Sequence, residues 1–206
     1  MKLIINTAQA PFFYAFYEAK TCLFEHKWDD SQLELEDLGP NIQASMDRLG
    51  VKQLEGILVI KGPGRFTSIR LGLSVAKAFA SVLGAPLYGL GTLEALVLSY
   101  PNKKDTCLLA LQLKADQFYV ALAGGSARSL FSEPILVDKT GLETLLDKSD
   151  EAITCLCPPA FPLLDAIKQE QITLALSSLA LAELLEGYLT SATAPQPVVP
   201  NYVFEP

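Results

Sequence analysis

Histidine is nearly absent from this chain of 206 residues, in which His26 is the single example. Any catalytic mechanism or zinc site that needs two imidazoles is therefore excluded. A Ser-His-Asp triad would have to use His26, which lies at the end of an expected strand, and no nucleophile-elbow motif accompanies it. The four cysteines are scattered, and Cys155 and Cys157 form C-x-C rather than C-x-x-C. This spacing favours buried, reduced thiols over a zinc site or a disulfide framework.

The chain also lacks a dense run of lysine and arginine and a long uninterrupted apolar segment. Its 16 Lys and Arg stand against 23 Asp and Glu, which gives a formal net charge of −7 at pH 7. A protein that grips nucleic-acid phosphates by itself usually carries a basic patch, so independent nucleic-acid binding is not expected. No segment reaches the roughly 18 apolar residues of a membrane span, and the N-terminus is a poor signal peptide. The sequence therefore predicts a cytoplasmic protein without a membrane partner.

The order of apolar runs and turn residues predicts strands followed by helices, and this order occurs twice. Half of the residues are hydrophobic, which is enough for a substantial core. Strands are expected at 2–6, 12–18, 21–27, 56–60 and 87–89, and helices near 33–49, 67–83 and 92–99. Gly39-Pro40 interrupts the first helical pattern, so this helix either begins near Pro40 or is kinked there. Beyond the polar run 100–105, strands are expected at 106–111, 118–123 and 153–157, a broken strand pair at 130–137, and helices at 142–146, 161–169 and 176–189. The prediction is a duplicated α/β unit with domains at residues 1–100 and 101–206.

The segment 61–83, KGPGRFTSIRLGLSVAKAFASVL, contains a helix with more apolar surface than one domain face requires. Its polar side chains fall on one stripe at helical spacing: Arg70, Ser74, Lys77 and Ser81. Residues with almost no side chain form a second ridge: Gly72, Ala76, Ala80 and Gly84. A glycine inside a helix costs about 1 kcal/mol relative to alanine, so Gly72 has a packing or functional reason. Two interpretations stay open: the helix is buried within its own domain, or a second polypeptide covers part of it.

A Gly-Pro-Gly turn precedes this helix, and such a turn can bind anions through free backbone N–H groups. The turn consists of Gly62, Pro63, Gly64, Arg65, Phe66 and Thr67. It lacks the Lys-Ser/Thr end of a P-loop, has Thr67 where a dinucleotide fingerprint has glycine, and loses one donor at Pro63. A structural loop with glycine at positive φ is the default interpretation, and a degenerate phosphate-like loop is the alternative.

This region resembles the TsaB (YeaZ) family, bacterial proteins needed to make threonylcarbamoyladenosine in tRNA. The family pattern GPGSFTGxRxGxxxAKGLA corresponds to GPGRFTSIRLGLSVAKAFA here, and the SSLEALA pattern that follows corresponds to GTLEALV. The match is specific over 62–83 and 89–96 and looser along the rest of the chain. The resemblance implies a duplicated α/β fold of the actin/hexokinase-like (ribonuclease H-like) class, with mixed sheets and flanking helices.

Departures from the family pattern fall at positions that surround the nucleotide in related actin-like ATPases. Asn6 and Gln112 replace two acidic residues that help to position metal and phosphate, and Lys114 stands for arginine. Arg65 and Ser68 replace the small residues Ser and Gly of the phosphate-like loop. Mg²⁺ is normally held by oxygen ligands such as carboxylates. The resemblance therefore implies a degenerate nucleotide site, with no metal and no cofactor of its own.

The resemblance further implies a non-catalytic scaffold that stabilises and activates a TsaD-type threonylcarbamoyl transferase. TsaB proteins pair with TsaD, or with themselves, through helices that correspond to 33–49 and 67–83 here. The expected interface residues are Leu35, Leu38, Ile42, Met46, Ile69, Arg70, Gly72, Leu73, Ala76, Phe79, Ala80 and Leu83. A TsaE-type ATPase is a further candidate partner, a homodimer through the same face is the alternative, and tRNA is contacted only through the complex.

Two enzymatic functions remain as competing hypotheses. One is a nucleotide-dependent phosphotransferase with an unusual site, using Thr7, Arg65, Thr67 and Lys114. The other, more remote, is a glycopeptidase, which older naming of the wider family implied. The single histidine and the missing zinc motif argue against it.

Overall fold

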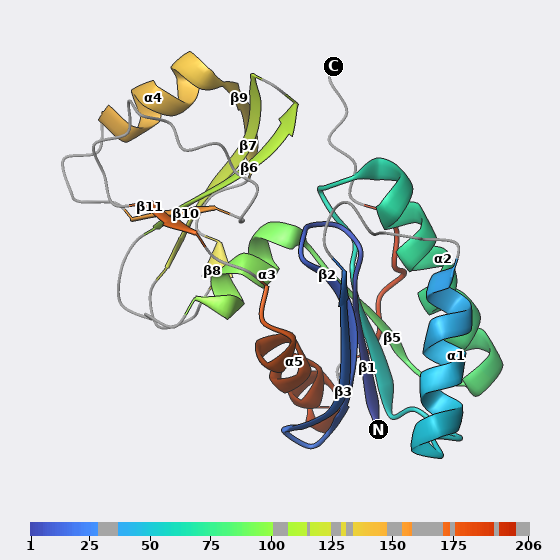
Figure 1. Ribbon diagram of the computed structural model, residues 1–206. Helices are drawn as coiled ribbons and strands as arrows, with labels where there is room; N and C mark the ends of the chain where they lie inside the picture. Colours follow the sequence, from blue (N-terminus) through green and yellow to red (C-terminus); the bar gives the residue numbers. More distant parts are fainter. Residues whose placement is uncertain are drawn as a thin grey trace. The chain divides into compact units, whose positions relative to one another are not determined.

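The computed structural model describes residues 1–28, 37–100, 107–114, 116–124, 129–130, 134–147, 154–157, 171–173, 176–191 and 194–200. Contacts divide the chain into two compact units. The first comprises Met1–Thr92 and Ser177–Tyr202, and the second comprises Leu93–Leu176 and Val203–Pro206. Each unit is built on one mixed β-sheet (Figure 1).

The first unit has a five-stranded sheet in the order β3-β2-β1-β4-β5. β1 (Lys2–Asn6), β2 (Phe12–Glu18) and β3 (Thr21–Trp28) form an antiparallel meander. β4 (Gly56–Ile60) and β5 (Leu87–Leu90) continue the sheet in parallel from β1. Every residue of β1 and β4 is buried, because helices cover both faces of the sheet. This explains why both strands are apolar runs without alternation.

Helices cover the two faces of this sheet. α1 (Leu38–Leu49) and α2 (Phe66–Leu83) lie on one face, and α5 (Ser178–Thr190) lies on the other (Figure 1). α2 packs mainly on β4, and α5 packs on β1 and β4. α1 begins at Leu38, so of the two expected alternatives the start near Pro40 is confirmed, and Pro40 falls in the first turn, where a missing N–H costs nothing. α1 and α2 both end at a left-handed glycine, Gly50 and Gly84.

The second unit repeats the strand order and directions of the first. β6 (Cys107–Lys114) and β7 (Gln117–Gly124) are antiparallel, and β9 (Ile135–Asp138) pairs with the other side of β7, as β3 does with β2. β10 (Thr154–Cys157) is parallel to β6, and β11 (Gln171–Thr173) is parallel to β10, as β4 and β5 are to β1. The short β8 (Ser129–Leu130) also joins β7.

α4 (Lys139–Asp147) covers the sheet of the second unit by packing on β7 and β9, while α3 (Thr92–Ser99) follows β5 in the chain. Between α4 and the sheet lies a hydrophobic cluster, to which α4 contributes Leu142 and the strands β6 and β7 contribute Leu108, Ala110, Phe118 and Val120. The two sheets share one topology, so the predicted duplicated α/β fold is confirmed. β11 was not expected from the sequence, and the helix expected at 161–169 lies outside the described residues.

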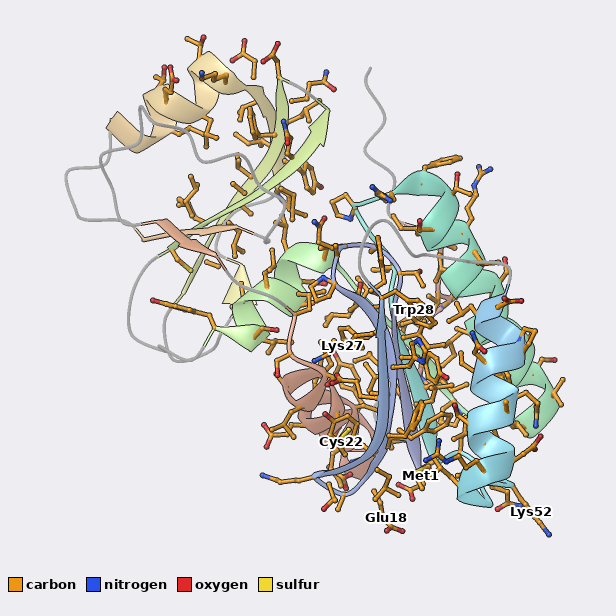
Figure 2. All side chains as sticks on the ribbon, in the orientation of Figure 1. Met1, Glu18, Cys22, Lys27, Trp28 and Lys52 are labelled. Carbon is orange, nitrogen blue, oxygen red and sulfur yellow. The ribbon has the colours of Figure 1, made fainter. Side chains whose placement is uncertain are left out.

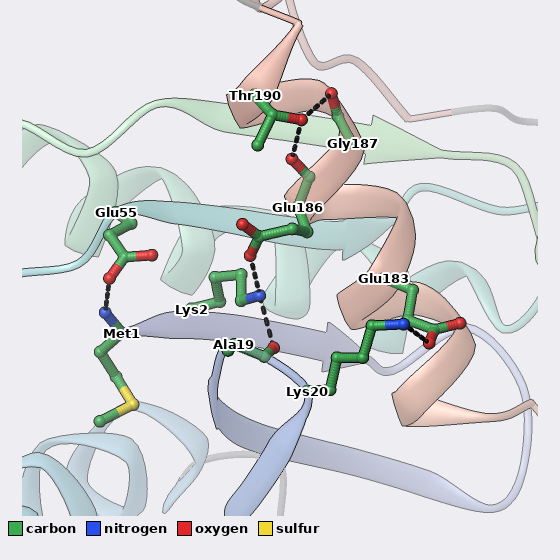
Figure 3. Close-up of polar contacts among 9 residues, drawn as sticks. All are labelled: Met1, Lys2, Ala19, Lys20, Glu55, Glu183, Glu186, Gly187 and Thr190. Atoms are coloured by element: carbon green, nitrogen blue, oxygen red, sulfur yellow. Dashed lines mark hydrogen bonds and ion pairs between the residues drawn. The ribbon is translucent and has the colours of Figure 1, made fainter.

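α5 belongs to the first unit, whereas the expected division at residue 100 placed it in the second. Two contacts account for this difference. Gly56 of β4 leaves room for Leu185, since a Cβ at this glycine would lie 3.2 Å from the leucine Cδ1. The buried ammonium group of Lys2 pairs with Glu186 of α5 and donates to the carbonyl oxygen of Ala19 at 2.6 Å (Figure 3).

α2 is the one helix within the described ranges that is long and apolar enough to cross a membrane, with a mean hydropathy of 1.3. Core helices of soluble proteins pass the same test. Here the side of α2 that faces β4 includes Ile69 and Leu73, which are 1% and 3% exposed. α2 thus contributes to the core of the first unit.

Candidate functional site

Asn6 ends β1 and is completely buried, and its amide organises the loop that follows. Nδ2 donates to the carbonyl oxygens of Gln9 at 2.8 Å and Pro11 at 2.9 Å. Oδ1 accepts the N–H groups of Ala8 at 3.2 Å and Gln9 at 3.4 Å. Two backbone acceptors and two backbone donors surround the amide, so a carboxylate here would face two carbonyl oxygens. The asparagine that replaces the family's acidic residue is therefore engaged within the loop.

The Gly-Pro-Gly loop packs against this same segment. Gly62 has φ of +100°, and its carbonyl accepts the N–H of Thr92 at 2.9 Å. The Thr92 hydroxyl donates to the carbonyl of Pro63 at 2.6 Å. A Cβ at Gly64 would lie 2.1 Å from the carbonyl oxygen of Ala8, and that oxygen accepts the Arg65 N–H at 3.2 Å. The positive φ and these internal contacts favour the structural interpretation of the loop over the phosphate-like one.

Gly72 lets α2 approach the end of β1 closely. The Thr7 hydroxyl donates to the Ser68 carbonyl at 2.8 Å, inside the protein. A Cβ at Gly72 would lie 2.1 Å from Thr7 Oγ1 and 3.1 Å from Thr7 Cβ. All three residues are buried, so the packing reason for a glycine in this helix lies within the chain.

For the buried part of the small-residue ridge, this placement favours the first of the two interpretations, in which the helix packs within its own domain. Most of the expected interface residues are interior: Leu38, Ile42, Met46, Ile69, Gly72, Leu73 and Ala76. They pack within the first unit, because α1 and α2 turn this side of each helix toward their own sheet. Arg70 is exposed, while Phe79, Ala80 and Leu83 are half-buried, and a role for these four stays a prediction. Leu35 lies outside the described residues.

The outward side of α2 carries a different apolar surface. Four apolar residues follow one another at spacings of four, three and four: Leu71, Val75, Ala78 and Val82, here called the outer stripe. Val82 is 83% exposed, Ala78 is exposed, and Leu71 and Val75 are half-buried. Val75 borders α1, since its Cγ2 lies 4.0 Å from the position of a Cβ at Gly39. Sequence periodicity detected the surplus apolar surface of α2, and the structure places part of that surface on the outward side of the helix.

The predicted polar stripe of α2 is confirmed. Its four members are all exposed: Arg70, Ser74, Lys77 and Ser81, here called the basic stripe. Side chains project outward from α1 and α2, away from the sheet (Figure 2). The outer stripe and the basic stripe therefore lie next to each other on one surface of the first unit.

His26 is a packing residue beneath α1. Its ring stacks on Tyr14, with centroids 5.7 Å apart, and lies 4.3 Å from the ring of Trp28, which sits on the α1 side of the sheet (Figure 2). The Tyr14 hydroxyl donates to the carbonyl of Asn41 at 3.0 Å and shares a hydrogen bond with Ser45. Burial raises the pKa of Tyr14 above its ordinary value. These contacts join α1 to the antiparallel strands.

Gln112 occupies the position in the second unit that Asn6 occupies in the first. Each residue lies near the end of the first strand of its unit and pairs with a phenylalanine of the second strand, Phe118 and Phe13 respectively. Gln112 is half-buried, and Lys114 ends β6. In the part of the chain that the structure describes, no group of three or more His, Cys, Asp or Glu residues is placed to hold a metal ion.

The duplicated sheets, with antiparallel strands followed by parallel ones in each unit, define an α/β protein of the actin/hexokinase-like class. A family model described as "TsaD: tRNA N6-adenosine threonylcarbamoyltransferase" matches residues 31–133, which is half of the chain. The chain therefore belongs to this family.

Relatives and solved structures agree with this assignment. A tRNA N6-adenosine threonylcarbamoyltransferase of Desulforapulum autotrophicum is 31% identical over 124 residues, 59% of this chain and 34% of the relative. The TsaB protein of Buchnera aphidicola, described as a tRNA threonylcarbamoyladenosine biosynthesis protein, is 32% identical over 74 residues, 35% of each chain. The chain thus matches about a third of the length of these curated relatives.

The structure of YeaZ from Pseudomonas aeruginosa superimposes with a TM-score of 0.78 at 17% identity, covering 98% of this chain and 99% of YeaZ. A second structure, from the same organism and described as similar to peptidase YEAZ, gives a TM-score of 0.77 at 16% identity and covers 98% of both chains. At this identity the two structures establish the fold. Together with the sequence relatives, they confirm the predicted resemblance to TsaB (YeaZ).

Proposed function

We propose that this chain is a scaffold subunit in tRNA threonylcarbamoyladenosine synthesis, which binds and stabilises a TsaD-type threonylcarbamoyl transferase. The observation that carries the proposal is the outer stripe, an apolar line on α2 in which Ala78 and Val82 are exposed and Leu71 and Val75 are half-buried. The family membership and the TsaB relative support the pathway, and the YeaZ-like fold supports the class of subunit.

The outer stripe has the spacing that a second helix needs. Residues spaced by three and four form one line along a helix, so a partner helix can pack along that line. Single exposed apolar side chains are ordinary, whereas a contiguous apolar line on a protein surface marks an interaction site. Each Å² of apolar surface that a partner covers contributes about 25 cal/mol before the costs of association.

Catalysis is assigned to the partner in this proposal. The amide of Asn6 is engaged by four backbone groups, and the Gly-Pro-Gly loop makes internal hydrogen bonds through its carbonyls. Both features support a nucleotide site that has become part of the fold, and neither favours the phosphotransferase hypothesis. The TsaE-type ATPase and a homodimer through the same face stay predictions from the resemblance, and the cytoplasmic location stays a prediction from the composition.

Val82→Asp is expected to weaken the complex with a TsaD-type protein from the same source by about tenfold or more, because it buries a charge in an apolar contact. Since Val82 is 83% exposed, the isolated variant should keep its fold. Co-expression followed by size-exclusion chromatography and a titration of the purified proteins measures the effect.

The matched control is Leu179→Asp, which places the same charge at a 43% exposed leucine on α5, across the sheet. This variant should bind as the unaltered chain does. Normal binding of Val82→Asp would refute the assignment of the outer stripe, and failure of the unaltered chain to bind would refute the proposed function itself.

A further inference from the structure

Charge is unevenly distributed in this acidic chain. The segment 61–83 contains four of the 16 cationic side chains and none of the 23 anionic ones. The cations are Lys61, Arg65, Arg70 and Lys77. The segment comprises α2 and the loop that leads into it, so an acidic protein presents a helix that carries only positive charge.

The cations of α2 lie on its outward side. Arg70 and Lys77 belong to the basic stripe, seven residues apart, which places them about 10 Å from each other along the helix axis. Ser74, between them, is uncharged and donates its hydroxyl to the carbonyl of Arg70 at 2.8 Å. The basic stripe runs beside the outer stripe, so any helix that covers the apolar line also meets these two cations.

An aromatic ring holds the guanidinium of Arg70 in place. The guanidinium carbon lies 3.8 Å from the ring centroid of Phe66, one helical turn earlier. Phe66 is 46% exposed and Arg70 is exposed, so a partner can reach the stacked pair at the beginning of α2. Arginine stacked on an aromatic ring is ordered before a partner arrives, which reduces the entropy lost when it pairs with a carboxylate.

The helix backbone adds to the positive potential at this end. The first turn of α2 contains no acidic residue, and the N-cap Arg65 makes no side-chain capping hydrogen bond. The positive end of the helix dipole therefore lies beside Arg65 and Arg70 without an acidic side chain of α2 to offset it.

We propose that the basic stripe, with the stacked pair Phe66 and Arg70, docks acidic side chains of the TsaD-type partner and fixes the orientation of the partner helix on the outer stripe. The inference rests on the proposed function and adds the chemistry of the partner: an apolar helix line flanked by carboxylates. Opposite charges across such an interface raise the association rate and fix the position of the partner helix along α2. Their effect on the affinity is smaller.

Other occupants fit this surface less well. A nucleic acid would be repelled by the net charge of −7, and the apolar side chains of the outer stripe cannot form ion pairs or hydrogen bonds with its phosphates. In a homodimer formed by contact of α2 with α2, each helix would present cations and no anions. Arg70 and Lys77 would then face like charges rather than carboxylates.

The test compares association rates of the double variant Arg70→Glu/Lys77→Glu and the unaltered chain with the TsaD-type protein, by stopped flow at 50, 150 and 500 mM NaCl. We expect the rate constant at 50 mM to fall at least tenfold and the difference to shrink at 500 mM, where the Debye length is only a few Å. Lys77→Glu alone, which leaves the stacked pair intact, should give an intermediate loss.

The control variant Lys52→Glu/Lys139→Glu makes the same change in net charge at exposed lysines that do not belong to α2. It should associate within about twofold of the unaltered chain. Equal loss in both double variants, or no loss in either, with the unaltered complex intact, would overturn this inference and leave the proposed function standing. Absence of a complex with the unaltered chain would overturn both.

Two further outcomes would also overturn it. In one, the α2 double variant abolishes self-association of the isolated chain and leaves the rate with the TsaD-type protein unchanged. In the other, it abolishes binding of the isolated chain to tRNA with that rate again unchanged. Circular dichroism and thermal melting confirm that each variant is folded before its rate is compared.

Discussion

Replacing Gly72 with leucine is expected to destabilise the isolated chain by about 3 kcal/mol or more, because the new side chain must occupy the space of Thr7. Even a Cβ at this position would lie 2.1 Å from Thr7 Oγ1. α2 cannot move away cheaply, since Ile69 and Leu73 are buried against the sheet. Urea unfolding of the isolated variant measures the loss.

Gly72→Ala separates the effect of helix propensity from the effect of the steric contact with Thr7. Gly72→Ala gains about 1 kcal/mol of helix propensity and loses a larger amount through the contact with Thr7. In a Thr7→Ala background Oγ1 and Cγ2 are gone and only the contact with Cβ at 3.1 Å remains, so the same change should cost much less. Ala78→Leu, at an exposed position of α2, is the control for added volume. An unchanged urea midpoint for Gly72→Leu would contradict the packing of α2 on Thr7.

The second large effect is a loss of thermal stability on removing the charge of Glu186, which pairs with Lys2 and joins α5 to β1. The Lys2 side chain is fully buried, and its ammonium group pairs with Glu186 and donates to Ala19 O at 2.6 Å (Figure 3). Glu186→Gln leaves this buried cation without its counter-ion, and we expect the Tm to fall by about 5–10 °C. Lys2→Met/Glu186→Gln, which buries no charge, should recover most of the loss.

The control for this pair is one helical turn away. Glu183 of α5 pairs with Lys20 at 3.1 Å, but the Lys20 side chain is 78% exposed (Figure 3). Exposed ion pairs contribute little, so Glu183→Gln should leave the Tm nearly unchanged. Equal shifts for the two glutamate variants would contradict the anchoring role of Lys2.

The same pair predicts a dependence on pH. The hydrogen bond and the positive charge of Lys2 hold the pKa of Glu186 below its ordinary value of 4.5. A carboxylate with a lowered folded-state pKa stabilises the protein above the unfolded pKa and loses this effect as the pH falls through the folded value. The Tm advantage over Glu186→Gln should therefore be complete at pH 7 and shrink as the pH falls below 4.5.

Local patterns predicted the elements of the first hundred residues well. β1, β2, β4 and α3 have the expected bounds, because strand runs, turn residues and caps are short-range signals. The second unit was harder, since β11 is only three residues long and has no turn signal of its own. The membership of α5 in the first unit depends on Lys2 and Gly56, which lie far away in the sequence.

In the candidate site, too, contacts between residues far apart in the sequence decide what local patterns cannot predict. Both the Gly72 ridge and the outer stripe satisfy the helical period, so periodicity cannot decide which of them faces the sheet. Thr7, at the end of β1, decides it, because only a glycine fits beside its hydroxyl. The sequence likewise showed that Asn6 replaces an acidic residue but not that its amide holds Gln9 and Pro11 in place.

Hydrogen–deuterium exchange of the chain alone and with the TsaD-type protein tests the location of the partner most directly. If the outer stripe binds the partner, peptides from α1 and α2 should exchange more slowly in the complex, while peptides from α5 keep their rates. Slower exchange in α5 with no change in α2 would place the partner on the opposite face of the sheet and contradict the account.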